Sequence, residues 1–159
     1  MAIQIRRFET DDAEEVAALV ARTLRESNGK DYSAKYIEEE IHRMPAAFFV
    51  EKAKQTHFYV FCHQDQIIGT GAIGSYWGSE TEFSLFDIFV LPEYQGRGVG
   101  RLVIETLEAD EYFKRAQRVE IPASITGVDF YRHMGYDFKR GHAVLDEERL
   151  YRLEKHKVQ

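Results

Sequence analysis

The chain has 159 residues, 44% of them hydrophobic, and we expect a single domain over residues 1–159 with a sizeable core. A net charge of −6 argues against nucleic acid as a partner, because phosphate binding needs a basic surface, and it favours a cationic or amine-bearing partner. One cysteine, no apolar leader and no apolar run of about 18 residues argue against an internal disulfide and a membrane span, and we expect a cytoplasmic protein.

Hydrophobic periodicity predicts regular elements along most of the chain. In chain order, we expect a strand over residues 2–8, helices over 9–26 and 33–43, an ambiguous segment over 46–55 that favours a short helix, strands over 57–63, 67–76 and 82–91, a helix over 98–113, a strand over 118–123, a helix over 126–133, and strands over 136–140 and 150–155. This order indicates a mixed α/β fold with antiparallel hairpins and one or two parallel crossovers.

The stretch EYQGRGVGRL places three glycines, Gly96, Gly98 and Gly100, between an apolar strand and a helix. The first turn of a helix has unpaired N–H groups and a partial positive charge, and glycines allow a ligand to approach the backbone closely. A phosphate-binding turn over Gln95–Arg101 and a plain glycine-rich turn both remain open from this motif alone.

Two common nucleotide-binding motifs are excluded by spacing. Gly96 is followed by Arg101 where a P-loop needs glycine and then lysine, and a dinucleotide fingerprint from Gly96 fails at the same position. The string GTGAIG, from Gly69 to Gly74, matches the dinucleotide fingerprint by letter, but no helix follows it. We expect these glycines to lie in a strand.

The string Gln95-x-x-Gly98-x-Gly100 follows a strand, and a second string, Phe130-Tyr131-x-x-x-Gly135-Tyr136, lies further along the chain. Together the two segments resemble the GNAT superfamily of N-acetyltransferases, and residues 3–20 resemble the usual first strand and helix of that family. The resemblance implies a three-layer α/β/α fold with a central, mostly antiparallel sheet that is splayed at the cofactor site. It also implies transfer of an acetyl group from acetyl-CoA to a primary amine by direct attack in a ternary complex. A non-catalytic acyl-CoA-binding regulatory domain of the same fold is the alternative.

The resemblance assigns cofactor binding to the glycine turn, to the backbone of the preceding strand and to the region of the second motif. The residues are Ile88, Phe89, Val90, Gln95, Gly96, Arg97, Gly98, Val99, Gly100, Arg101, Ser124 and Phe130. Ser124 stands where many relatives carry an asparagine. No metal is expected.

Tyr131 matches the family's tyrosine that protonates the departing thiolate, and a phenol with a pKa near 10 remains protonated at neutral pH. A general base must also deprotonate the acceptor ammonium. Glu82, at the start of the strand before the glycine turn, is our first candidate, and Glu120 or a water molecule is the alternative. Asp87 is disfavoured, because strand alternation places it on the opposite face from Glu82.

The acceptor is expected to be a small amine or a peptide amine, with no nucleic acid or membrane as a partner, and a homodimer remains open. Aromatic and acidic residues suit an ammonium compound. The expected lining residues are Tyr32, Tyr36, Tyr76, Trp77 and Glu80.

Overall fold

The strands of the computed structural model form one sheet in the order β1-β2-β3-β4-β5-β7-β6 within residues 1–157, which the structure describes. The strands are β1 (Gln4–Arg7), β2 (Thr56–His63), β3 (Gln66–Ser75), β4 (Glu82–Val90), β5 (Arg118–Ala123), β6 (Asp137–Phe138) and β7 (Tyr151–His156). All neighbouring pairs are antiparallel except β4 and β5. The apolar run of β3 is buried on both faces of the sheet, as its central position requires.

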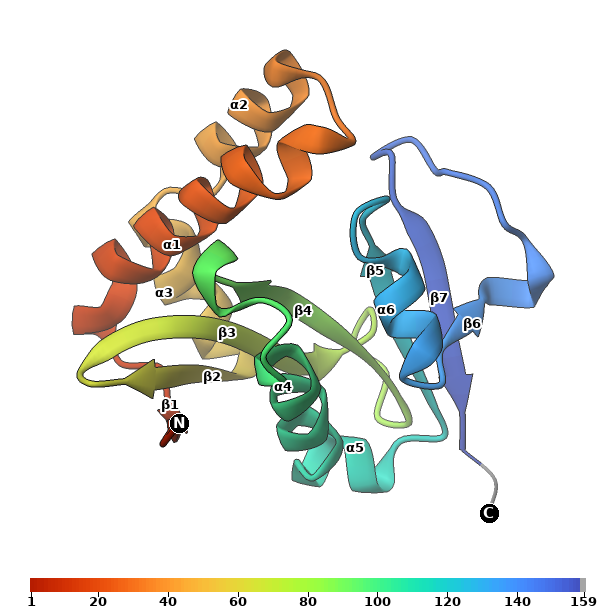
Figure 1. Cartoon of the computed structure of the whole chain (residues 1–159). Coiled ribbons are helices and arrows are strands. Elements are labelled where there is room, and N and C mark those ends of the chain that lie inside the picture. Colours follow the sequence, from red (N-terminus) through yellow and green to blue (C-terminus); the bar gives the residue numbers. More distant parts are fainter. Residues whose placement is uncertain (158–159) are drawn as a thin grey trace.

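Helices cover both faces of this sheet (Figure 1). They are α1 (Ala13–Glu26), α2 (Ala34–Arg43), α3 (Ala46–Gln55), α4 (Val99–Glu108), α5 (Glu111–Arg115) and α6 (Val128–His133). Helix α3 lies behind the sheet and packs against α1, and α4 lies in front of β3 and β4. The mixed, three-layer α/β fold expected from the sequence is confirmed. No helix in the described part of the chain is long and apolar enough to span a bilayer.

Gly71 in β3 explains how closely α4 can approach the sheet. A Cβ atom at this position would lie 2.6 Å from Cγ1 of Val103 on α4. The GTGAIG string therefore belongs to a strand on which a helix packs, and the prediction that it is not a dinucleotide-binding loop is confirmed.

Two of the predicted elements differ clearly from those in the structure. The helix predicted over 98–113 is broken after Glu108, because the side chain of Asp110 accepts a hydrogen bond from the Tyr112 amide (2.8 Å) and starts α5. The strand predicted over 136–140 is only two residues long, because Arg140 has a φ of 53° in the turn that follows Phe138.

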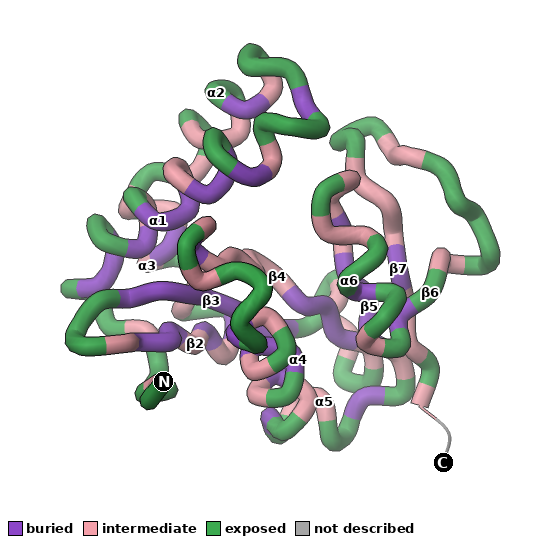
Figure 2. Tube along the Cα trace, in the orientation of Figure 1, coloured by how far each residue is buried: buried purple, intermediate pink, exposed green. Residues whose placement is uncertain are grey.

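The sheet splits between its two parallel strands. Strands β4 and β5 pair only where Glu82–Ser84 faces Arg118–Glu120, and the later parts of both strands have separated. The splayed sheet that the sequence predicted is therefore present. Figure 2 shows that the turn between β4 and α4 is exposed, and its residues 95–98 lie between buried Leu91 and buried Val99.

Candidate active site

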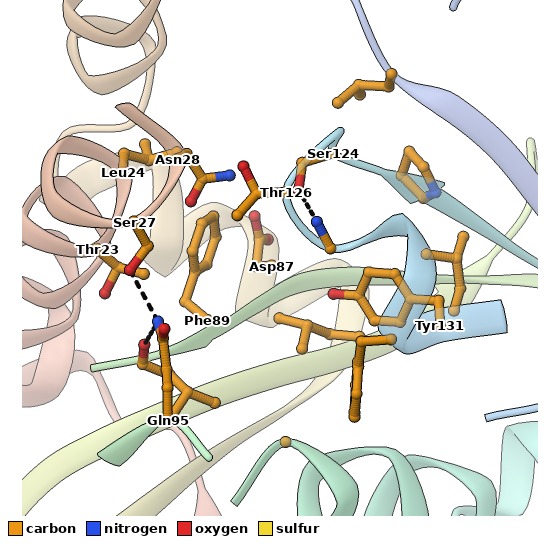
Figure 3. A pocket seen from close by; sticks show the side chains of 18 of the residues that line it. Thr23, Leu24, Ser27, Asn28, Asp87, Phe89, Gln95, Ser124, Thr126 and Tyr131 are labelled. Atoms are coloured by element: carbon orange, nitrogen blue, oxygen red, sulfur yellow. Dashed lines mark hydrogen bonds between the residues drawn. The ribbon is translucent and has the colours of Figure 1, made fainter. Parts of the chain in front are cut away.

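A cavity of about 580 Å³ occupies the gap between β4 and β5. Its walls come from α1, α2, β4, the glycine turn, the start of α4, β5 and α6 (Figure 3). The volume lies within the usual range for small-molecule sites. The split of the sheet thus brings the two sequence motifs, which lie on different elements, to a single cavity.

The glycine turn supplies backbone donors at one end of this cavity. Gly96 and Gly98 have φ angles of 73° and 85°, and a Cβ on either would meet no atom within 4 Å. The six successive amides from Gly96 to Arg101 donate to no other group within residues 1–157. They include the first amides of α4, where the helix dipole is positive, so the turn can hold an anion.

Gly100 has a different role from the two glycines before it. A Cβ there would lie 3.2 Å from the ring of Phe130, so this glycine lets α6 pack against the start of α4. Phe130 is 37% exposed and, like Arg101, lines the cavity.

The side chain of Gln95 ties the turn to both neighbouring walls. Its Nε2 donates to Oγ of Ser27 (2.9 Å) at the end of α1 and to the carbonyl of Val90 (3.0 Å) at the end of β4. Val90 lines the cavity together with Ile88 and Phe89, all on the part of β4 that β5 has left. The β4 backbone from Ile88 to Val90 therefore has an edge that β5 does not pair.

Two residues of the turn have side chains outside the cavity wall. Arg97 lies over the ring of Tyr94 (5.1 Å), and Val99 is buried facing Gly69. Their amides remain part of the turn, so any contact from these two residues to a ligand in the cavity is through the backbone.

Tyr131 lines the cavity from α6, and its hydroxyl points into it (Figure 3). The side chain is buried, and burial raises its pKa above the ordinary value of 10. The phenol is therefore protonated throughout the neutral range. Ser124 also lines the cavity, but its hydroxyl accepts from the amide of Gly127 (3.0 Å) and so shapes the turn that leads into α6.

The structure does not bring Glu82 to this cavity, which corrects our first candidate for the base. Its carboxylate binds Nε of Arg118 (2.7 Å) at the far end of β4, and it is not a lining residue. The rival Glu120 is also outside: its side chain is buried between Arg118 (3.0 Å) and Lys139 (2.8 Å). Both carboxylates belong to a network of ion pairs that holds β4, β5 and β7 together.

Asp87 lines the cavity instead, although strand alternation predicted otherwise. The register between β3 and β4 jumps from Thr70–Phe89 to Ala72–Phe86, and Asp87 has a φ of 52° inside the resulting bulge. One carboxylate oxygen, Oδ2, is buried and has no hydrogen-bond partner within residues 1–157. Burial raises the pKa of Asp87 from 3.8 to about 6, and the positive charge of Lys52 partly opposes this rise.

Sequence reasoning ranked Asp87 below Glu82 because it could not foresee the bulge, which changes the face to which a strand residue points. One signal was available, namely a lone carboxylate in the apolar run FSLFDIFV. Aspartate is also one of the few residues that adopts a positive φ with some ease.

The predicted acceptor-side residues divide into two groups. Tyr32 and Tyr36 line the cavity with stacked rings (4.5 Å), and their hydroxyls donate to the carbonyls of Arg149 (2.7 Å) and Glu148 (2.6 Å). Tyr36 on α2 and Tyr32 just before it thereby connect this part of the chain to the loop before β7.

The other three predicted residues, Tyr76, Trp77 and Glu80, lie at the turn between β3 and β4 and outside the cavity. Trp77 is 91% exposed, so it packs on no cavity wall.

Comparisons with known proteins point to one family. A family model described as an acetyltransferase (GNAT) domain matches residues 54–137. Among solved structures, PaiA N-acetyltransferase from Thermoplasma acidophilum, in complex with coenzyme A, is 17% identical with a TM-score of 0.84 and covers 99% of this chain and 100% of its own. A GCN5-related N-acetyltransferase from Rhodopseudomonas palustris is 20% identical with a TM-score of 0.78 and covers 99% of each chain.

A third structure, Ard1 from Thermoplasma volcanium, is 17% identical with a TM-score of 0.73 and covers 100% of each chain. At these identities the solved structures support the fold alone. No curated protein matches the chain.

Proposed function

Because the chain belongs to the GNAT family of acetyltransferases, we propose that it transfers an acetyl group from acetyl-CoA to the nitrogen of a small primary amine, in a ternary complex. The observation that carries this proposal is the cavity itself. Among residues 1–157, it joins a turn of amides that donate to no other group, an open strand edge, a protonated tyrosine and a carboxylate with one oxygen that lacks a hydrogen-bond partner. Those are the groups that acyl transfer between a large anionic carrier and an amine requires.

The glycine turn fits the diphosphate of coenzyme A. Within residues 1–157, the amides of residues 96–101 donate to no other group and can bind an anion. A side chain at Gly96 or Gly98 would occupy the open space that the anion needs. The edge of Ile88, Phe89 and Val90 fits a pantetheine arm that pairs with the backbone like an added strand. The structure of the PaiA neighbour in complex with coenzyme A supports the same use of the fold here.

Asp87 is the general base of this proposal. A protonated amine has no lone pair for attack, so a carboxylate must first take its proton. With a pKa of about 6, Asp87 is mostly ionised at neutral pH yet basic enough to accept a proton efficiently. Asp87 lines the cavity near Phe89, on the β4 wall along which we expect the cofactor to bind (Figure 3).

Tyr131 is the general acid. The acetyl thioester of the bound cofactor supplies the acyl group, and its carbon–sulfur bond breaks as the amine nitrogen bonds to the acyl carbon. Tyr131, protonated because burial raises its pKa, gives its proton to the thiolate that leaves. Asp87 thus takes a proton from the attacking amine, and Tyr131 gives a proton to the leaving thiolate.

The acceptor side of the cavity suits a small amine. Its walls are apolar or aromatic at Tyr32, Tyr36, Ile37 and Met44, and Glu40, which also pairs with Arg43, adds a carboxylate there. Such a mixture binds an ammonium group through charge and ring faces while it buries an apolar body.

A thiol-release assay with acetyl-CoA and a panel of small amines and peptides tests the proposal. Asp87→Asn is expected to lower kcat by about 10²–10⁴-fold, the usual contribution of one general base. The matched control is Glu82→Gln, which removes the carboxylate outside the cavity. Binding of acetyl-CoA without thiol release for any amine would favour the non-catalytic alternative, a regulatory domain that binds acyl-CoA.

A further inference from the structure

Among residues 1–157, Lys52 has no carboxylate partner and lies outside the lining of the cavity. Its ammonium lies 4.0 Å from the ring centre of Phe86 and 5.7 Å from that of Phe48, and it forms no ion pair within residues 1–157. The side chain is half-buried on α3 and is not a lining residue of the cavity. Phe86 directly precedes Asp87 in β4, so the aromatic contact holds this charge on the residue before the proposed base, and the charge of Lys52 acts on the Asp87 carboxylate.

Resting on the proposed role of Asp87, we propose that Lys52 is a positioning residue: it is the counter-charge that keeps Asp87 ionised in the cavity, and it acts through the wall without touching substrate. An unpaired cation normally extends its head into water, because burial without a partner costs free energy. Here the ammonium is held on an aromatic face instead. The positive charge therefore acts on the nearby Asp87 carboxylate through its electrostatic attraction.

Two opposing effects act on Asp87. Burial raises its pKa, and the attraction of Lys52 lowers it, with a net value of about 6. A carboxyl with this pKa is roughly nine-tenths ionised at pH 7, and one whose pKa is a unit higher is only about half ionised. Loss of the Lys52 charge therefore lowers the fraction of Asp87 that is ionised, and so able to act as a base, at neutral pH.

Other ionisable groups also line the cavity around Asp87. Glu40 faces it from α2 but is paired with Arg43, and Arg101 faces it from the start of α4. The remaining ones are the phenols Tyr32, Tyr36 and Tyr131. Among these and the other described residues, Lys52 is the charged group whose attraction offsets the burial of Asp87.

Lys52→Met tests the inference, because it keeps a long apolar stem on Phe86 and removes the charge. The direct readout is a carboxyl ¹³C NMR titration of the unliganded protein, in which the Asp87 signal is assigned by its loss in Asp87→Asn. We expect the midpoint to rise by roughly 0.5–1 pH unit in Lys52→Met and to stay near the wild-type value in Lys52→Arg. Lys54→Met is the matched control, since Lys54 lies on the same helix, is exposed and pairs with Glu51.

The kinetic readout is the acid limb of kcat/KM against pH, which reports the free enzyme. It is expected to move upward with the NMR midpoint in Lys52→Met, while the rate above the limb remains within about twofold of wild type. An unchanged Asp87 midpoint in Lys52→Met overturns the inference even if Asp87→Asn is inactive. A raised midpoint together with a fully active Asp87→Asn variant supports the Lys52–Asp87 coupling and refutes the base role instead.

Discussion

Replacing the proposed base with its neutral analogue is expected to stabilise the folded protein. Burial of Asp87 raises its pKa from 3.8 to about 6, so the folded state keeps this proton at pH values where the unfolded chain has lost it. The free energy of unfolding therefore falls as pH rises from about 4 to about 6, and the loss is complete above that range. At about 1.4 kcal/mol per pH unit, the cost of ionised Asp87 at pH 7.5 is about 3 kcal/mol.

Asparagine carries no charge and tolerates the positive φ of 52° at this position, so the backbone contributes little to the comparison. We expect Asp87→Asn to raise the free energy of unfolding by up to about 3 kcal/mol at pH 7.5 and to be nearly neutral at pH 4, where Asp87 itself is protonated.

Urea denaturation of both proteins across pH 4–7.5 measures this difference directly, and the other carboxylates cancel in it. A difference that does not grow with pH, or a variant that is less stable at pH 7.5, would show that Asp87 is not a buried, strained carboxylate.

The remaining predictions concern the other groups of the site. Tyr131→Phe is expected to lower kcat by about 10²-fold or more while the dissociation constant of acetyl-CoA stays unchanged; equal turnover would remove the acid role. Gly98→Glu places a carboxylate at the free amides and should abolish the rise in melting temperature caused by coenzyme A, whereas Gly78→Glu, at a glycine with a similar φ of 78° outside the cavity, should keep it. Glu82→Gln should retain turnover within about threefold, because Glu82 lies outside the cavity, and a loss of the size expected for a base would restore it as a candidate.

Local sequence determined the elements that bind the cofactor in our proposal. The turn at Gly96 and Gly98 needs positive φ angles and open space, and a few neighbouring residues encode both. The same holds for the helix that carries Tyr131, since its start and its glycine end are read from adjacent residues. Such features depend on backbone geometry within one short segment, so the sequence alone was sufficient to predict them.

Only the tertiary structure decided which carboxylate enters the cavity. Asp87 turns inward because β4 slips in register against β3, and Glu82 is held away because Arg118, 36 residues further along the chain, binds it. Register and long-range ion pairs depend on how distant segments pack, which strand alternation within one segment does not contain. The sequence therefore determined the backbone of the glycine turn that we propose binds the cofactor, while the β3–β4 register and the Arg118 ion pair decided which carboxylate lies beside it.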